Sequence, residues 1–347
     1  MTKLHFPLLI AVSLLAGACS KTGIATDEVQ ELSLSPEVSQ PTKAALTGTT
    51  LGTDNKYVVY LSASSAEMGN FFSDQLYSYC ADGGKWRASS DKGIADPILW
   101  PFGGGELDFL GLACMKEAHD ALQDQIKWDA TLPANAVKIE DWDLNEHPYD
   151  IMYASKNAQG YTTNNGTVDM QFRHSQALIT FTAKCAVPEI EGVEITDAFT
   201  IKGITVNGLD HVGTLTVDNT HSTLTANWTK TEGSTPADME VSGLGEDGVV
   251  LSEDDYTTCG DGFIVMPQSA KSITIKYRLR HAVNDLEYTF DIPRTVWKAG
   301  NQYNYALDFS LEEIKVIPTV ENWEETVYKV DNDPANGSDN DVNSYSR

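Results

Sequence analysis

The chain has 347 residues, enough for about two domains of ordinary size, and 41% of them are hydrophobic, so a sizeable core can form. Its 50 acidic residues outweigh 24 basic ones and leave a net charge of -26, which repels nucleic-acid phosphates and anionic membrane surfaces. The charge therefore argues against a nucleic-acid partner and indicates a soluble, exposed protein.

The first nineteen residues, MTKLHFPLLIAVSLLAGAC, have the pattern of a bacterial lipoprotein signal. A basic residue precedes the apolar run Phe6–Leu15, which is about half the roughly 20 residues that a membrane-spanning helix needs. Small residues then lead to Cys19. We therefore expect a signal peptide over residues 1–18, cleavage between Ala18 and Cys19, and lipidation of Cys19, whose acyl chains anchor the protein to a membrane. An ordinary secretory signal is the alternative.

Residues 19–43 are polar and poor in aromatic side chains, which is typical of a tether or propeptide. A short alternation from Val29 to Leu34 predicts one strand within this segment. From Ala44 onward, short apolar runs such as KYVVYLSA and LDFLGLA predict buried strands. The segment MKEAHDALQDQIKW is the one helix candidate, because it places three apolar residues, Ala118, Leu122 and Ile126, on one face.

The second half alternates more cleanly between apolar and polar residues. The segments QALITFTAK, KSITIKYRLR and NQYNYALDFSL each have the period of two that marks half-buried antiparallel strands. Many short strands with few helices predict an all-β fold of sandwiches. The turn-rich run TTNNGT places the boundary between an N-terminal domain over 44–170 and a C-terminal domain over 171–328. The acidic tail, 329–347, is predicted to be disordered.

The sequence offers little support for catalysis, metals or cofactors. It contains neither an HExxH metal motif nor a GxSxG nucleophile elbow. Four cysteines follow Cys19 without CxxC spacing, so they are interpreted as buried small hydrophobes, with one or two disulfides left open. They are Cys80, Cys114, Cys185 and Cys259. His174 is expected in a core or at a strand edge. We therefore predict no catalytic, cofactor-binding or metal-binding residues.

The acidic stretch EDWDLNEH, residues 140–147, has two interpretations. Trp142 could stack on a sugar, and Asp141 with Asp143 could form the carboxylate pair of a glycosidase. Acidic residues are so common in this chain that such clusters arise by chance. A plain loop is therefore the favoured interpretation of this stretch.

The run ILWPFGGGELDFLGLA has three consecutive glycines, Gly103–Gly105, between two apolar segments. A phosphate-binding loop requires a following helix and a nearby Lys, and this stretch has neither. We therefore predict a turn between two strands, which brings Trp100 and Phe109 into one core from adjoining strands.

Several segments, taken in order, resemble the fimbrillin family, the type V pilus subunit lipoproteins of Bacteroidetes. They are TKAALTGT, PILWPFGGGELDFLGLA, VDMQFRHSQALITFTAK, FIVMPQSAKSITIKYRL and WKAGNQYNYALDFSLEEIKV. Together with the lipoprotein signal, the resemblance covers most of residues 1–325. It implies an all-β fold of two transthyretin-like β-sandwich domains with Greek-key-type antiparallel sheets, preceded by the lipoprotein signal and tether.

The resemblance also implies a function. Such a protein is a structural or adhesive subunit of a surface fimbria (pilus), not an enzyme, and is exported as an outer-membrane lipoprotein by way of lipoprotein signal peptidase. A surface protease removes the N-terminal segment in shaft subunits, and donor-strand exchange with other pilus subunits follows. The matching cleavage position lies between Lys43 and Ala44, although the family typically has Arg there. Shaft, anchor and tip roles all stay open, as does binding to host or bacterial surface receptors; a cell-surface glycan-binding lipoprotein is the alternative.

Overall fold

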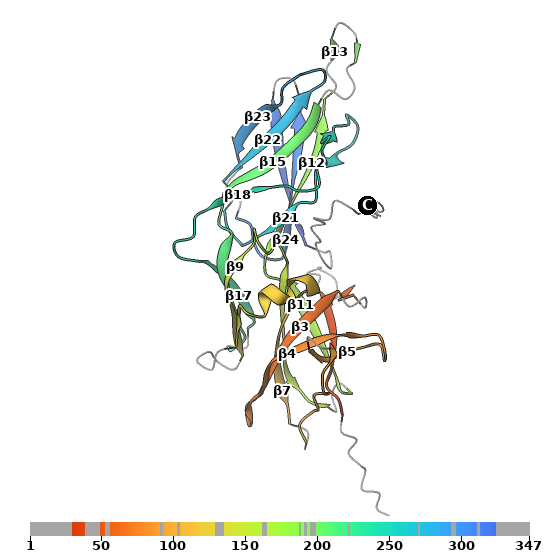
Figure 1. The fold of residues 1–347 in the computed structure, drawn as a ribbon, viewed down its shortest axis with the longest axis vertical. Helices are drawn as coiled ribbons and strands as arrows, with labels where there is room; N and C mark the ends of the chain where they lie inside the picture. Colours follow the sequence, from red (N-terminus) through yellow and green to blue (C-terminus); the bar gives the residue numbers. More distant parts are fainter. Residues whose placement is uncertain are drawn as a thin grey trace, which may run out of the picture.

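A computed structural model shows an elongated, almost entirely β-stranded molecule (Figure 1), so the prediction of an all-β fold is confirmed. The helical elements in the described part of the chain are two short turns, η1 (Lys116–Ala118) and α1 (His119–Leu122). The structure describes residues 30–38, 49–52, 56–90, 93–102, 105–128, 135–161, 165–186, 189–190, 193–194, 199–220, 223–269, 271–292, 296–310 and 313–323.

The first half of the chain forms one sheet that closes on itself. Its strand order is β2-β1-β11-β10-β7-β3-β4-β5-β6, and an additional bridge between β1 and β5 closes a ring. The strands are β1 (Ser33–Val38), β2 (Thr49–Thr50), β3 (Tyr57–Ser65), β4 (Gly69–Cys80), β5 (Lys85–Ser90), β6 (Gly93–Ile94), β7 (Leu107–Met115), β10 (Ile151–Gln159) and β11 (Thr167–His174). This closed ring differs from the predicted pair of facing sheets, because β1 contacts strands on both of its edges. The transthyretin-like arrangement stays a prediction.

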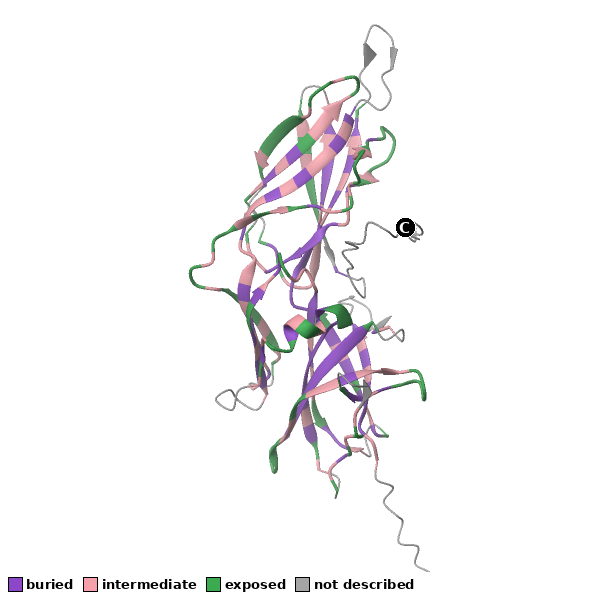
Figure 2. Cartoon of the chain, in the orientation of Figure 1, coloured by how far each residue is buried: buried purple, intermediate pink, exposed green. Residues whose placement is uncertain are grey.

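Strands β3 and β7 are apolar on both faces because both faces are covered (Figure 2). In β3, Val59 and Leu61 point into the interior of the ring, whereas Val58 and Tyr60 point outward into a second core. This arrangement explains why the sequence of β3 reads as a continuous apolar run and not as an alternation.

The second half is a sandwich of two sheets. One has the order β20-β12-β24-β25 with β21 on β12, and the other has the order β18-β15-β22-β23 with β19 on β15. The predicted alternation is confirmed in β22, for example, where Ile273 and Ile275 are fully buried. The strands are β12 (Ala177–Cys185), β15 (Phe199–Leu209), β18 (Ala237–Glu240), β19 (Val249–Val250), β20 (Thr257–Thr258), β21 (Phe263–Val265), β22 (Ser272–Leu279), β23 (Leu286–Asp291), β24 (Asn301–Phe309) and β25 (Ile314–Asn322), with a separate hairpin of β13 (Glu189–Ile190) and β14 (Val193–Glu194).

A fourth sheet draws strands from both halves. Its order is β17-β16-β9-β8, in which β8 (Ile126–Lys127) and β9 (Ala136–Asp143) precede the sandwich in sequence, while β16 (Val212–Asp218) and β17 (Thr225–Lys230) lie within its sequence range. It contributes to a junction core that also includes residues of the ring and the sandwich, among them Tyr60, Leu112, Ile139, Trp142, Leu178, Leu215, Ile264 and Trp323.

The expected domain boundary at residues 170/171 falls inside β11. The chain leaves the ring after His174, and β12 of the sandwich begins at Ala177. The helix candidate is shorter than expected, since β8 follows α1 closely. Its three apolar residues are nevertheless all buried in the junction core, as their spacing indicated: Ala118, Leu122 and Ile126.

Trp100 and Phe109 meet in the ring core with their ring centroids 5.9 Å apart, as predicted for the glycine-rich stretch. Gly103 and Gly104 themselves lie outside the described residues. The segment before these glycines, which includes Trp100, does not pair with β7, which includes Phe109. The prediction that the two residues come from adjoining strands is therefore wrong. The partner of this segment is the approach to β1, through a bridge between Glu31 and Leu99 and a hydrogen bond from the Trp100 N–H to the Gln30 carbonyl.

None of the four cysteines that lie in the described part of the chain is in a disulfide. Cys114, Cys185 and Cys259 are buried, in line with their interpretation as small hydrophobes, while Cys80 is half-buried. Burial raises the pKa of the Cys259 thiol to about 12, so this thiol stays protonated at neutral pH.

Candidate functional site

Strand β1 lies in the middle of the ring sheet, with partners on both edges. One edge pairs in parallel with β11 along the whole strand, from Ser33 opposite Thr167 to Val38 opposite Phe172. The other edge is covered by three short antiparallel contacts: the bridge at Leu99, a single pair with β5, and a two-residue pairing with β2. The very first strand of the described chain is therefore an interior part of the sheet.

The side chains of β1 alternate between the ring core and the outer surface. Leu32, Leu34 and Val38 are at most 3% exposed and pack in the ring core, and Pro36 is buried with them. Burial of each such aliphatic side chain stabilises a fold by about 1.5–3 kcal/mol. The alternation in the sequence predicts a strand a few residues earlier, over Val29–Leu34. The observed strand runs further because the alternation continues through Pro36 to Val38.

Polar contacts fix the register of β1. The hydroxyls of Ser33 and Thr167 lie 2.8 Å apart, and the Gln171 amide donates to the Glu37 carboxylate over 2.5 Å. Just before the strand, Arg87 pairs with Glu31 at 2.6 Å, and this hydrogen bond raises the pKa of the Arg87 guanidinium. A slipped strand would lose these contacts together with its apolar alignment.

The pairing between β1 and β5 is interrupted beside Pro36. Leu34 pairs with Trp86, and the next contact on this edge is the hydrogen bond from the Leu51 N–H to the Pro36 carbonyl. Pro36 has no N–H to donate to this edge, and a cavity of about 300 Å³ is lined in part by Pro36, Tyr79 and Trp86. Strand β1 is therefore fully paired on its β11 edge and only partly paired on the other.

The predicted processing residues all lie outside the described part of the chain, namely Ala18, Cys19, Lys43 and Ala44. Their place in the sequence is still informative. The bond between Lys43 and Ala44 falls between β1 and β2, which are consecutive in the chain. Breaking it would leave β1 attached to the ring by noncovalent contacts alone.

The acidic stretch EDWDLNEH does not form a sugar-stacking site. Trp142 is fully buried in the junction core, so the hypothesis that its ring is presented to a ligand is wrong. The first half of the stretch, up to Asp143, belongs to β9 and not to a loop. Asp141 has a positive φ of 51°, which marks a β-bulge that turns Trp142 inward.

The two aspartates of this stretch have separate partners. Asp141 accepts a hydrogen bond from the Thr231 hydroxyl at 2.8 Å, whereas Asp143 contacts His211 Nδ1 at 2.8 Å and the Asn145 N–H at 2.9 Å. Burial alone would raise the pKa of Asp143, but these hydrogen bonds outweigh it and lower the pKa. Neither carboxylate is placed as one half of a catalytic pair.

An aromatic side chain is exposed elsewhere, at the end of the ring. Phe102 is 93% exposed and lines an open cavity of about 620 Å³ together with Met68 and the carboxylates of Glu67, Glu106 and Asp108. Phe102 is not predictable as an exposed site from the sequence, because an isolated Phe beside glycines carries no distinctive signal.

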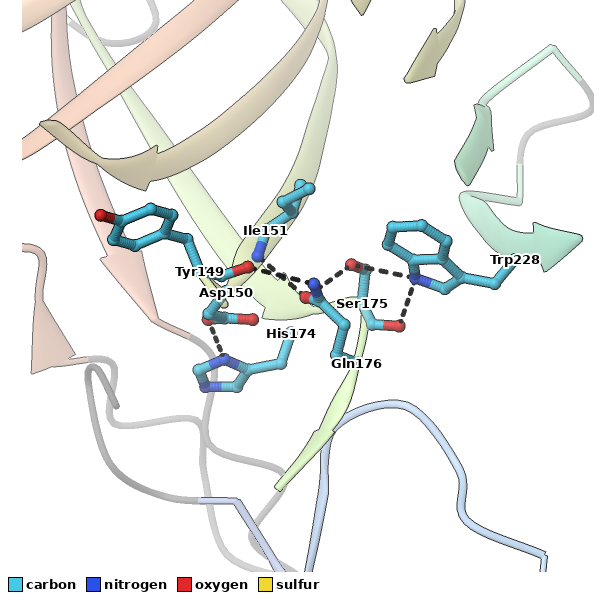
Figure 3. Close-up of polar contacts among 7 residues, drawn as sticks. All are labelled: Tyr149, Asp150, Ile151, His174, Ser175, Gln176 and Trp228. Atoms are coloured by element: carbon cyan, nitrogen blue, oxygen red, sulfur yellow. Dashed lines mark hydrogen bonds and ion pairs between the residues drawn. The ribbon is translucent and has the colours of Figure 1, made fainter. Parts of the chain in front are cut away.

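A buried polar cluster lies where the ring meets the sandwich (Figure 3). His174 was expected in a core or at a strand edge; it is the last residue of β11 and is 3% exposed, and its Nδ1 contacts Asp150 Oδ2 at 2.6 Å. The Gln176 side chain accepts from the Ile151 N–H and donates to the Tyr149 carbonyl. These hydrogen bonds tie the end of β11 and the start of β12 to β10, and the cluster is closed to solvent.

Within the part of the chain that the structure describes, no group of His, Cys, Asp or Glu residues is arranged to hold a metal ion. The same described residues include no helix of the length and apolarity needed to cross a bilayer.

The fold and the site define an all-β protein whose first strand is inserted into the sheet of its N-terminal half. The profile of the family described as fimbrillin-like matches residues 42–323, and the chain belongs to this family. A crystal structure of a fimbrial protein from Bacteroides vulgatus has a TM-score of 0.58 at 12% identity, over 85% of this chain and 99% of that one. A candidate cell adhesion protein from Bacteroides uniformis has a TM-score of 0.52 at 15% identity, over 86% and 99%. No curated protein matches the chain.

Proposed function

We propose that this protein is a structural, non-catalytic subunit of a cell-surface fimbria that is assembled by donor-strand exchange. The observation that carries the proposal is β1, an interior strand that a single break between Lys43 and Ala44 would separate from the rest of the chain. Export as a lipoprotein on Cys19 would bring the uncut chain to the outer membrane. Loss of β1 there opens a groove with apolar walls and an unpaired edge of β11, which is the type of site that a partner's strand completes.

Strand β25 has the sequence pattern that this groove requires. In β1 the inward positions are Leu32, Leu34, Pro36 and Val38, and in β25 the same spacing holds Ile314, Val316, Pro318 and Val320. Both strands therefore read as two aliphatic residues, a proline and a valine at alternate positions. The match sets a register in which β25 of one subunit runs parallel to β11 of the next.

The groove would bury β25 better than its own sheet does. Val320 is 53% exposed in β25, whereas Val38, at the equivalent position of β1, is 1% exposed. Pro318 is likewise exposed, while Pro36 is buried. β25 also pairs with β24 on one edge alone within the described sheet, while β1 has partners on both edges. The transfer of β25 into a neighbour's groove therefore increases both apolar burial and strand pairing.

A strand-replacement experiment tests the proposal. A chain beginning at residue 20, with a specific protease site inserted between Lys43 and Ala44, is folded, cut, and mixed with a peptide of residues 313–322. We expect the peptide to replace the N-terminal segment, as measured by native mass spectrometry. A peptide with Val316→Asp should fail, because position 316 takes the buried place of Leu34. Its matched control, Ile317→Asp, should still bind, because position 317 takes the outward place of Ser35.

Retention of the N-terminal segment with every peptide, or equal binding of the two aspartate peptides, would contradict this mode of assembly. On intact cells, Ala44 as the first residue would assign a polymerising shaft subunit. A lipidated Cys19 as the first residue would instead assign an anchor held in the membrane.

Glycan binding is a second candidate function, and Phe102 is the observation that favours it. The exposed ring offers a stacking face beside carboxylates that can accept hydrogen bonds from sugar hydroxyls. Selective signals on a glycan array that disappear in Phe102→Ala would support this function at the end of the ring.

A further inference from the structure

The C-terminal segment of the described chain pairs with β24 along the whole of β25 and ends at one deeply buried side chain. Strand β25 is half-buried at best, since Ile317 and Val320 are 38% and 53% exposed. Trp323, directly after it, is 1% exposed and lies in the junction core. Its indole stacks on the imidazole of His174, with ring centroids 3.8 Å apart and planes 10° from parallel.

The surface that receives Trp323 is rigid. Asp150 contacts the Nδ1 of His174 and so fixes the orientation of the imidazole whose face the indole covers. The backbone N–H of Trp323 donates to the Gly300 carbonyl, and the backbone N–H of Gly300 in turn donates to the Gln176 carbonyl. These hydrogen bonds connect the end of β25 to the polar cluster between the ring and the sandwich. The residues of that cluster lie far from β25 in the sequence.

The same contact leaves buried polar atoms without partners. Among the described residues, Trp323 Nε1, His174 Nε2 and Asp150 Oδ1 are buried and make no hydrogen bond. Unpaired buried polar groups destabilise the closed arrangement, and exposure to water on opening would satisfy them. The stacking of Trp323 therefore combines a large apolar contact, which favours closure, with three polar atoms that favour opening.

We propose that Trp323 on His174 is an autoinhibitory latch that keeps β25 on its own sheet until the strand is transferred to a neighbouring subunit. The inference rests on the proposed assembly by strand exchange, which supplies the need to retain β25. Trp323 is the positioning residue of the donor strand, and Asp150 acts through His174. Opening this contact removes the anchor at the end of β25. Release of the strand then requires its separation from β24 and the loss of the packing of Ile314 and Val316 on the sandwich core.

Amide hydrogen exchange of the uncut chain tests the latch independently of assembly. In Trp323→Ala, we expect the amides of β25 to exchange about tenfold faster or more, since a buried Trp is lost, with β12 unchanged. Trp323→Phe, which retains a ring over His174, should stay near the wild-type rate. Trp228→Ala is the matched control, because Trp228 is an aromatic residue of the same junction that donates to the Ser175 carbonyl and lies outside the C-terminal segment.

Equal exchange of β25 in Trp323→Ala and the wild type would overturn the latch. So would an equal acceleration in Trp228→Ala, because general loosening of the junction would then explain the effect. After the cut at residues 43/44, Trp323→Ala should form oligomers faster than the wild type. If the cut wild type forms oligomers and Trp323→Ala forms them at the same rate, the latch is overturned as well. If β25 exchanges faster but the cut chains of both forms stay monomeric, the latch stands and strand-exchange assembly fails.

Discussion

At the scale of single residues, two aromatic side chains occupy opposite environments. Trp142 is fully buried in the junction core, while Phe102 is 93% exposed. We expect Trp142→Ala to lower the free energy of unfolding by about 3–5 kcal/mol, because it leaves a large cavity. Phe102→Ala should change it by less than about 0.5 kcal/mol. Urea denaturation followed by circular dichroism measures both. A small effect of Trp142→Ala would mean that its side chain is not packed as described.

Residue positions could be predicted where the alternation is regular, and not where it shifts. In β9, Val137 and Ile139 point inward, and strict alternation would place Asp141 inward next. The bulge at Asp141 moves the pattern by one residue, so that Trp142 and Leu144 are buried instead. Nothing in the local sequence marks this bulge. His174 was expected in a core or at a strand edge and is buried, but its partners Asp150 and Trp323 come from distant parts of the chain, which the sequence alone does not bring together.

At the scale of elements, β1 combines a buried face with an outward one. In the uncut chain, Leu34→Asp should destabilise the ring by about 3 kcal/mol or more, because it places an unpaired carboxylate in an apolar core. Ser35→Asp, at the next and half-buried position, should cost about 0.5 kcal/mol or less. Thermal unfolding together with binding of an apolar dye measures the two variants. Similar losses in both would show that β1 has no inward register in solution.

The sequence predicted most elements of the sandwich, but not the closure of the ring. The strands β12, β22 and β24 are half-buried, so their sequences alternate and their positions follow directly. Closure depends on the pairing of β1 with β11 and β5, which lie far apart in sequence. Alternation identifies the inward face of a strand but does not identify its neighbours. The donor-strand pattern shared by β1 and β25 is visible in the sequence, yet it gains meaning only once β1 is seen to be an interior strand.

At the scale of the whole molecule, the two halves share the fourth sheet. β9 pairs with β16 along most of its length, and Asp143 at the end of β9 contacts His211, which directly precedes β16. The buried residues of the sandwich core, in contrast, all lie between Ala177 and Phe309, and Ile314 and Val316 of β25 pack against them. The predicted division into domains over 44–170 and 171–328 remains a prediction about folding units. In an isolated second unit the sandwich core is complete, but β16 lacks β9, one of its two partner strands.

A fragment of residues 176–323 tests this organisation. We expect its sandwich to unfold cooperatively, because the sandwich core is complete within the fragment. The amides of β16 and β17 should exchange much faster than in the whole chain, since removal of β9 exposes Leu215 and Val217, which are fully buried in the intact protein. Addition of a fragment of residues 20–175 should restore their protection, because it supplies β8 and β9. Native-like protection of β16 in the isolated fragment would mean that the halves are independent and that the fourth sheet does not couple them.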